Sequence, residues 1–106
     1  MERAVILTTE ERESLERLGQ RLRLARLRRN LSQADVAERA GVTRKTYQAL
    51  EAGRGTASVA LLVKVLGIFG YPERIAQLLE ADPIGEDLEE VHGRKRAGRS
   101  SDVADF

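Results

Sequence analysis

Cysteine is absent from this chain of 106 residues, and so is tryptophan. Without cysteine the chain can form neither a disulfide bond nor a thiolate metal site, and this is compatible with a reducing, intracellular compartment. Phe and Tyr together make up only 4% of the sequence, so Leu, Val and Ala must fill any core. The length suits a single domain, and the many small aliphatic residues favour a helical bundle.

Long apolar runs are also missing. No run approaches about 20 residues, the length that an α-helix needs to span a bilayer. The N-terminal region has an acidic residue, Glu2, and only a short apolar patch, Ala4–Leu7, which does not match a secretory signal. We therefore expect a cytoplasmic protein with no membrane partner.

The residue groups that enzymes and metal sites require are not recognisable either. The only histidine, His92, has no serine, cysteine or carboxylate that the sequence can assign to it as a partner. The carboxylates that precede it lack the spacing and the glycine of a calcium loop; they are Glu86, Asp87, Glu89 and Glu90. We predict no enzymatic activity, no catalytic residue, no metal and no cofactor.

Charge is distributed unevenly, although the formal net charge is only +1. Residues 16–54 carry ten Arg and Lys against four Asp and Glu, whereas residues 72–93 carry one Arg against seven Asp and Glu. A basic half attracts a polyanion such as a nucleic acid. The acidic half has two interpretations, a spacer or a surface for a basic partner.

Apolar periodicity and capping residues predict an all-α fold. Ser32, Thr43 and Ser58 are suitable N-caps, and Gly41 suits a left-handed turn. Gly19 either permits close helix packing or marks where two helical pieces meet. Helices are expected at about 10–29, 33–40, 44–52, 59–69 and 72–81. We divide the chain into an N-terminal arm (1–9), a helical domain (10–81) and an acidic, then basic tail (82–106) without regular structure.

Residues 33–52 have the pattern of a helix-turn-helix, which places its second helix in the major groove of DNA. Val42, Tyr47 and Leu50 are expected to face the core. Arg binds guanine through two hydrogen bonds, Lys also donates to guanine, and Gln pairs with adenine. The predicted base contacts are accordingly Arg44, Lys45 and Gln48. The alternative interpretation of these three residues is a solvated helix face.

Phosphate contacts are predicted around the same motif. Gln33 lies at a helix N-terminus, where backbone amides bind anions, and Arg54 with the amides of Gly53 and Gly55 lies at the other end of the motif. The predicted set is Ser32, Gln33, Thr43, Thr46, Tyr47 and Arg54. Basic residues of the tail are candidates for additional DNA contacts, with solvated disorder or a protein partner as alternatives; they are Arg94, Lys95, Arg96 and Arg99.

Two apolar residues, Leu24 and Leu27, lie opposite the apolar stripe of the first helix. They are either scattered surface leucines, which are common, or they pack under the N-terminal arm or against a second chain.

The segment Leu31–Thr43, followed by Leu50-Glu51-Ala52-Gly53, resembles the XRE/Cro family of lambda-repressor-like DNA-binding domains. The resemblance covers residues 18–79. It implies a five-helix domain that binds a double-stranded DNA operator as a homodimer and usually represses transcription. It also implies a buried ion pair between Arg26 and Glu51. Tyr47 departs from the family pattern, which usually has an aliphatic residue there.

A looser resemblance concerns the second half of the chain. Residues 58–70, followed by an amphipathic segment, an acidic stretch and a basic tail, are similar to the HipB-type antitoxins. That resemblance implies a HipA-type kinase toxin as partner and repression of the protein's own operon. Two functional hypotheses follow: a sequence-specific repressor, or a protein-interaction antitoxin whose DNA binding is secondary.

Overall fold

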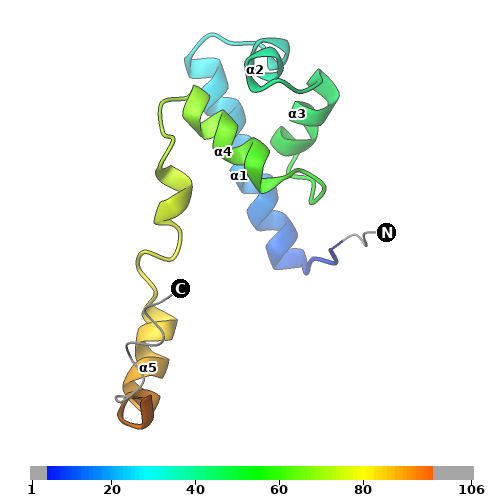
Figure 1. The fold of residues 1–106 in the computed structure, drawn as a ribbon. Coiled ribbons are helices and arrows are strands. Elements are labelled where there is room, and N and C mark those ends of the chain that lie inside the picture. The colour runs from blue at the N-terminus through cyan, green and yellow to red at the C-terminus, as the bar shows by residue number, and fades with distance from the viewer. Residues whose placement is uncertain (1–4, 97–106) are drawn as a thin grey trace. The chain divides into compact units, whose positions relative to one another are not determined.

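The structure is a computed structural model that describes residues 5–96, without the side chains of residues 94–96. The chain divides after Ile75 into two units. The first unit contains four α-helices, α1 (Thr9–Arg28), α2 (Gln33–Ala40), α3 (Arg44–Glu51) and α4 (Val59–Ile68) (Figure 1). A short 3-10 turn, η1 (Arg74–Gln77), spans the boundary, and α5 (Pro83–Arg96) belongs to the second unit.

Side-chain caps determine where the helices of the first unit begin. Thr8 and Ser32 each accept a hydrogen bond from the backbone three residues later and form capping boxes with Glu11 and Asp35. The side chains of Thr43 and Ser58 accept an equivalent backbone hydrogen bond, from Thr46 and Leu61, at the starts of α3 and α4. Such caps satisfy backbone N–H groups that have no partner within the helix. The predicted all-helical fold and the predicted starts of α2, α3 and α4 are confirmed.

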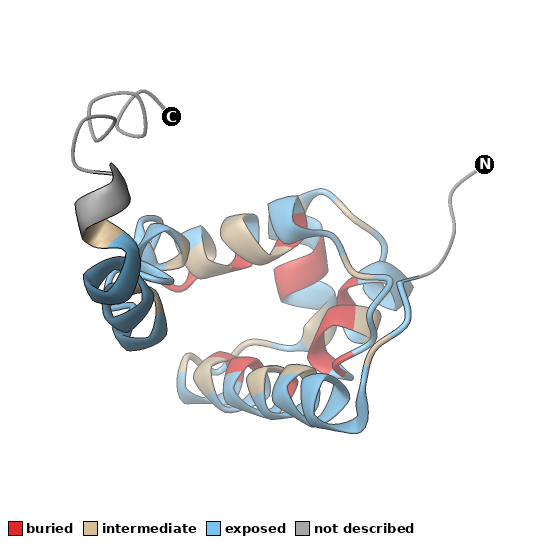
Figure 2. Ribbon diagram, turned by 90° about the horizontal axis from the view of Figure 1, so that it is seen from below, coloured by how far each residue is buried: buried red, intermediate tan, exposed pale blue. Residues whose placement is uncertain are grey.

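The core of the first unit lies between these four helices, where Figure 2 shows the buried residues on the inward faces. Among the described residues α3 packs against both α1 and α2, and α2 packs against α4. The buried apolar residues are Leu22, Val36, Ala37, Tyr47, Leu50, Leu61, Val65 and Phe69. Burial of each such side chain contributes roughly 1.5–3 kcal/mol. The turn between α2 and α3 is closed by Gly41, which has a φ of 75°.

Two glycines let α1 and the end of α3 approach at backbone distance. A Cβ atom on Gly19 would lie 2.2 Å from the carbonyl oxygen of Glu51. A Cβ atom on Gly53 would lie 2.6 Å from the Cα of Glu16. α1 continues through Gly19 without a break, so close packing, not a junction of two pieces, is the reason for this glycine.

Arg29 connects α1 to the end of α4 and does not belong to a free basic surface. Its guanidinium donates 2.8 Å hydrogen bonds to the carbonyls of Ala25 and Phe69. It also lies 5.0 Å from the centre of the Phe69 ring, a cation–π distance. The positive charge is thus placed against the C-terminal end of α4, where the helix dipole favours it.

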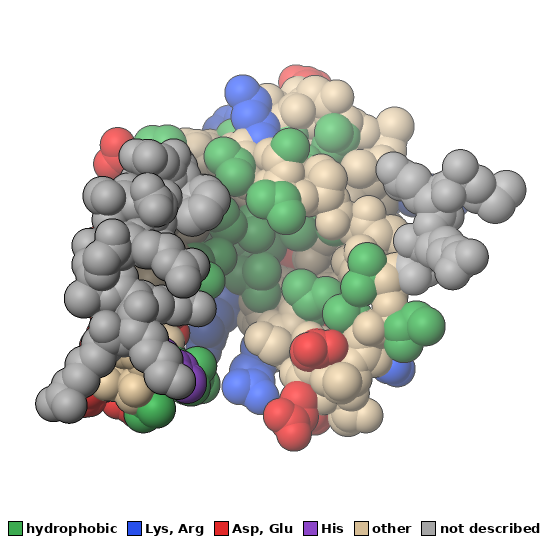
Figure 3. All heavy atoms as spheres, turned by 60° about the horizontal axis from the view of Figure 1, so that its bottom comes forward, with side chains coloured by type: hydrophobic (Ala, Val, Ile, Leu, Met, Phe, Trp, Pro, Cys, Tyr) green, Lys and Arg blue, Asp and Glu red, His purple; other side chains and the backbone are tan. Residues whose placement is uncertain are grey.

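Several apolar side chains of the first unit remain at the surface, and Figure 3 shows hydrophobic atoms gathered on one face. Val59 at the start of α4 is 69% exposed, and Leu24 and Leu27 on α1 are about half exposed. The arm residues Val5–Leu7 line a hollow with the loop after α3. These described arm residues therefore do not cover Leu24 and Leu27.

The second half of the chain differs from the sequence prediction. The helix expected at 72–81 is only the 3-10 turn η1, and Leu79 has a φ of 65°, which is incompatible with a continuing α-helix. The segment from Pro83, expected to lack regular structure, forms α5. Proline suits the first turn of a helix, and the Asp82 carboxylate accepts a 3.0 Å hydrogen bond from the N–H of Gly85. The prediction failed because it placed the helix start at Pro72 instead of Pro83.

Candidate nucleic-acid interface

α3 presents its first turn and one face to solvent. Tyr47, Leu50 and Glu51 are buried, so the helix is anchored along its inner face and at its C-terminal end. Arg44, Lys45 and Gln48 are exposed. Arg44 and Gln48 are four residues apart and therefore share one face of the helix. The structure thus leaves all three predicted base contacts accessible on α3.

Most of the predicted phosphate contacts are also accessible. Ser32, Thr43, Thr46 and Arg54 are exposed, and Gln33 is half-buried. The Ser32 hydroxyl accepts a 3.0 Å hydrogen bond from the N–H of Asp35, and this leaves its own hydrogen to donate. The hydroxyls of Thr43 and Thr46 lie 2.9 Å apart and share a hydrogen bond.

Tyr47 is wrongly predicted as a phosphate contact. Its side chain is 0% exposed, and its hydroxyl donates a hydrogen bond to Oε2 of Glu51, one helical turn further on. A buried tyrosine hydroxyl needs such a partner. The position that is usually aliphatic in the family therefore adds a polar group to the core and none to the DNA-facing surface.

The phosphate site predicted from Arg54 and the amides of Gly53 and Gly55 has fewer available donors than expected. The Gly53 N–H donates a 3.0 Å hydrogen bond to the carbonyl of Leu50, and Gly53 itself is buried. It is therefore not available to a phosphate. Arg54 and Gly55 remain exposed beside it.

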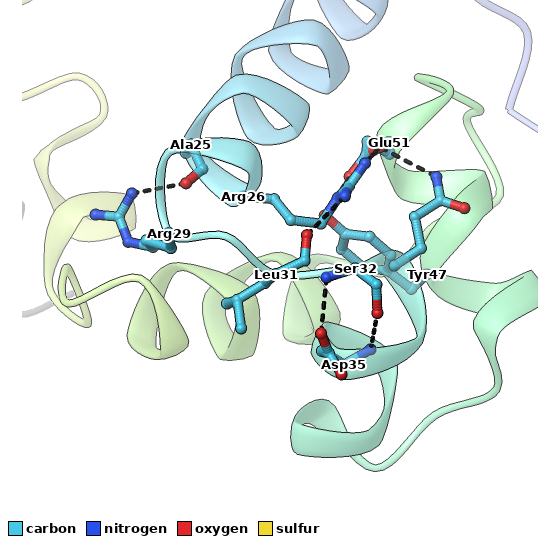
Figure 4. A network of polar contacts seen from close by, with 9 residues as sticks. Ala25, Arg26, Arg29, Leu31, Ser32, Asp35, Tyr47 and Glu51 are labelled. Atoms are coloured by element: carbon cyan, nitrogen blue, oxygen red, sulfur yellow. Dashed lines mark hydrogen bonds and ion pairs between the residues drawn. The ribbon is translucent and has the colours of Figure 1, made fainter.

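Behind the exposed face lies the ion pair implied by the family resemblance (Figure 4). Arg26 Nε and Nη2 donate to the two carboxylate oxygens of Glu51 at 2.8 and 2.9 Å. Arg26 is 7% exposed and Glu51 is 8% exposed. The third guanidinium nitrogen, Nη1, donates a 2.8 Å bond to the carbonyl of Leu31, just before α2. One side chain of α1 thus links the start of α2 to the end of α3.

Glu51 accepts hydrogen bonds from four nitrogen or oxygen atoms in total, because Gln33 Nε2 also lies 3.1 Å from its Oε1. Burial alone would raise the pKa of Glu51, but the hydrogen bonds from Arg26, Tyr47 and Gln33 outweigh it and lower that pKa. Burial and the bond to Glu51 raise the pKa of Tyr47, so its hydroxyl remains a donor. The hydrogen bond to Glu51 raises the pKa of Arg26. The carboxylate is therefore charged and fully paired.

Sequence reasoning missed the parts of this network contributed by Tyr47 and Gln33. A signal was present for Tyr47, since it precedes Glu51 by four residues and must share its helix face. The contact between Gln33 and Glu51 joins two helices and has no equivalent local signal.

The remaining predicted contacts fall in the tail. Arg99 and the side chains of Arg94, Lys95 and Arg96 lie outside the described part of the chain. Within the described residues, no three His, Cys, Asp or Glu side chains gather closely enough to bind a metal ion. Over residues 5–96, no helix is both long and apolar enough to traverse a lipid bilayer.

Comparison with known proteins agrees with the geometry of the first unit. A family model described as helix-turn-helix matches residues 22–75, a range that begins within α1 and includes α2, α3 and α4. No curated protein matches the chain.

Proposed function

Because the chain belongs to the XRE-type, lambda-repressor-like family of helix-turn-helix proteins, it is a DNA-binding transcription regulator, and we propose that it is a homodimeric autorepressor. We place it in the cytoplasm, since its partner would be an operator in double-stranded DNA. Arg44, Lys45 and Gln48 are proposed to contact bases. Ser32, Gln33, Thr43, Thr46 and Arg54 are proposed to contact phosphates.

The observation that carries this proposal is the contrast between the two sides of α3. Its inner side is held by buried residues and by the ion pair of Glu51, while Arg44 and Lys45 stand exposed at the opposite end. A rigidly mounted helix with exposed cationic donors suits the major groove, where guanine presents two acceptors. Five of the ten basic residues in residues 16–54 lie on α1. The four exposed ones would add attraction to the phosphate backbone; they are Arg17, Arg21, Arg23 and Arg28.

The proposal of a dimer is based on the short length of α3, the recognition helix. α3 contains eight residues and is therefore about 12 Å long, so one copy reads only a few base pairs. Two copies related by a twofold axis read two half-sites about one helical turn apart.

The fluorescence anisotropy of labelled duplexes, titrated at several salt concentrations, tests this function. We expect affinity for the operator to fall steeply with salt and the stoichiometry to be two chains per operator.

Arg44→Ala is expected to weaken binding to the preferred operator by about 1–3 kcal/mol and binding to random DNA much less. The reason is that a base contact contributes to discrimination, whereas a phosphate contact contributes to both duplexes alike. The same anisotropy titration on both duplexes measures the difference. Arg17→Ala, at an exposed arginine of α1, is the matched control. Equal losses on the two duplexes would rule out Arg44 as a base contact.

A second candidate function, the restraint of a HipA-type kinase toxin, is favoured by α5. Ile84, Leu88 and Val91 recur at steps of four and three residues, and each is more than half exposed. Acidic residues flank this apolar stripe, which is the pattern of an amphipathic helix that binds an apolar groove edged by basic residues. We expect the full chain to retain a kinase-like partner from the same operon in co-purification, and Leu88→Ser to lose it. If no stable partner is retained, the antitoxin function is refuted and only the repressor function remains.

A further inference from the structure

Gln33 connects the start of α2 to the buried carboxylate at the end of α3. Its Nε2 atom lies 3.1 Å from Oε1 of Glu51. An ionised carboxylate has acceptors only, so the Gln33 amide must direct its nitrogen, and not its oxygen, towards Glu51. The Gln33 side chain is therefore held in one of its two amide orientations.

The position of the Glu51 carboxylate is itself fixed by hydrogen bonds from other residues. Arg26 holds both of its oxygens, at 2.8 and 2.9 Å, and Tyr47 donates to one of them. Arg26 also binds the carbonyl of Leu31, two residues before Gln33. The carboxylate and the backbone that leads into α2 are thus positioned by the same guanidinium.

The constrained amide lies at a helix end with free donors. An amide nitrogen has two N–H groups, and only one of them can point to Glu51. The N–H groups of Gln33 and Ala34 are the first two of α2 and have no partner within the helix. Asp35, the acidic residue of this turn, accepts a 2.8 Å hydrogen bond from the N–H of Ser32. The second N–H of the side chain and the two backbone N–H groups belong to the same helix start, where backbone donors suit a phosphate oxygen.

We propose that Glu51 is a positioning residue for DNA-backbone binding, because it orients the Gln33 amide so that its second N–H faces a phosphate at the α2 N-terminus. This role is separate from the pairing of Glu51 with Arg26, which fixes α3. It rests on the proposed DNA-binding function. Glu51, at the end of α3, therefore influences the contact between the start of α2 and a DNA phosphate.

A double-mutant cycle tests this inference. Operator affinity is measured by anisotropy for the wild type, Glu51→Gln, Gln33→Leu and the double variant, each corrected for the folded fraction from circular dichroism. The affinity loss caused by Glu51→Gln should be about threefold to tenfold larger with Gln33 present than with leucine there, the range expected for one hydrogen bond. Equal losses in the two backgrounds would show that Glu51 acts only through α3 and would overturn the proposal.

A matched background and a milder variant keep the test decisive. Gln48→Leu removes an exposed glutamine of α3, and in that background the effect of Glu51→Gln should persist. Gln33→Asn leaves the buried ion pair intact but shortens the side chain by one methylene, so that it cannot reach Glu51 and a phosphate together. It should bind the operator as weakly as Gln33→Leu. Full affinity of Gln33→Asn would contradict the proposal even if Glu51→Gln failed to fold.

Failure of this inference is distinguishable from failure of the proposed function. If Arg44→Ala weakens operator binding while Gln33→Leu does not, the protein binds DNA, and the positioning role of Glu51 is refuted together with the phosphate contact of Gln33. If neither variant changes binding and the wild type binds no duplex in a salt-dependent manner, the DNA-binding function itself is refuted, and the positioning role with it.

Discussion

Arg26→Ala is expected to lower the free energy of unfolding by about 3–5 kcal/mol, the usual cost of removing one partner from a buried ion pair. The substitution leaves the carboxylate of Glu51, which is 8% exposed, without its cation. It also removes the donor to the Leu31 carbonyl. Because the start of α2 and the end of α3 both lose support, operator affinity should fall together with the melting temperature.

Thermal and urea melts monitored by circular dichroism measure this effect. Arg23→Ala is the matched control, since Arg23 lies on the same helix and is exposed; its effect should be within about 0.5 kcal/mol. An unchanged melting temperature for Arg26→Ala would contradict the structural role of the pair.

The pH dependence of the melt provides a second check on the same prediction. The pKa of Glu51 is lowered in the folded state from an ordinary value of 4.5, so its contribution to stability is complete above that value. The contribution is lost as the pH falls through the lowered pKa of the folded state. In Arg26→Ala the main cause of the lowering is removed while burial still favours the protonated acid, so the variant should lose less stability than the wild type as the pH falls through this range. The lowered pKa of Asp35, caused by its hydrogen bonds to Ser32, remains in both proteins.

Gly19→Ala is expected to destabilise the fold by about 3 kcal/mol or more, the upper part of the range for overpacking. The added methyl group would lie 2.2 Å from the carbonyl oxygen of Glu51, and a backbone atom cannot move aside as the end of a side chain can. Helix propensity alone predicts the opposite sign, since alanine is better than glycine by about 1 kcal/mol within a helix. The sign of the change therefore decides between packing and propensity.

Chemical denaturation of the two variants Gly19→Ala and Gly67→Ala measures this difference directly. Gly67 lies within α4, and a Cβ atom there meets nothing within 4 Å. Gly67→Ala should therefore be neutral or stabilising. If both variants were equally stable, the close approach of α1 to the end of α3 would not exist in solution.

Much of the first unit could be predicted from the sequence because its signals are local. Ser32, Thr43 and Ser58 are caps whose effect extends only three residues, and Gly41 closes a turn that favours glycine. The accessible positions of Arg44, Lys45 and Gln48 follow from the same helical periodicity. Arg26 and Glu51 were paired through a family resemblance, since 25 residues separate them.

The remainder depended on contacts between distant residues or on a choice between similar local signals. By sequence Arg29 belongs to the basic half of residues 16–54, and only the structure shows that Phe69 lies beside it. Tyr47 is correctly predicted to face the core, but its hydroxyl, predicted to contact a phosphate, donates to Glu51 inside the core instead. Pro72 and Pro83 are equally good helix starts by sequence, and only the structure distinguishes them.

The buried residues of α3 lie towards its C-terminal end, so a small rotation there displaces its N-terminal end. These buried residues lie from Tyr47 to Glu51, whereas Arg44 lies at the opposite end, about 10 Å from Glu51 along the axis. A tilt of about 5° at the anchored end therefore moves Arg44 by about 1 Å, a large part of the tolerance of a hydrogen bond. Substitutions that loosen the region around Gly19, Arg26 or Gly53 by a small amount should thus degrade the fidelity of base selection before they unfold the domain.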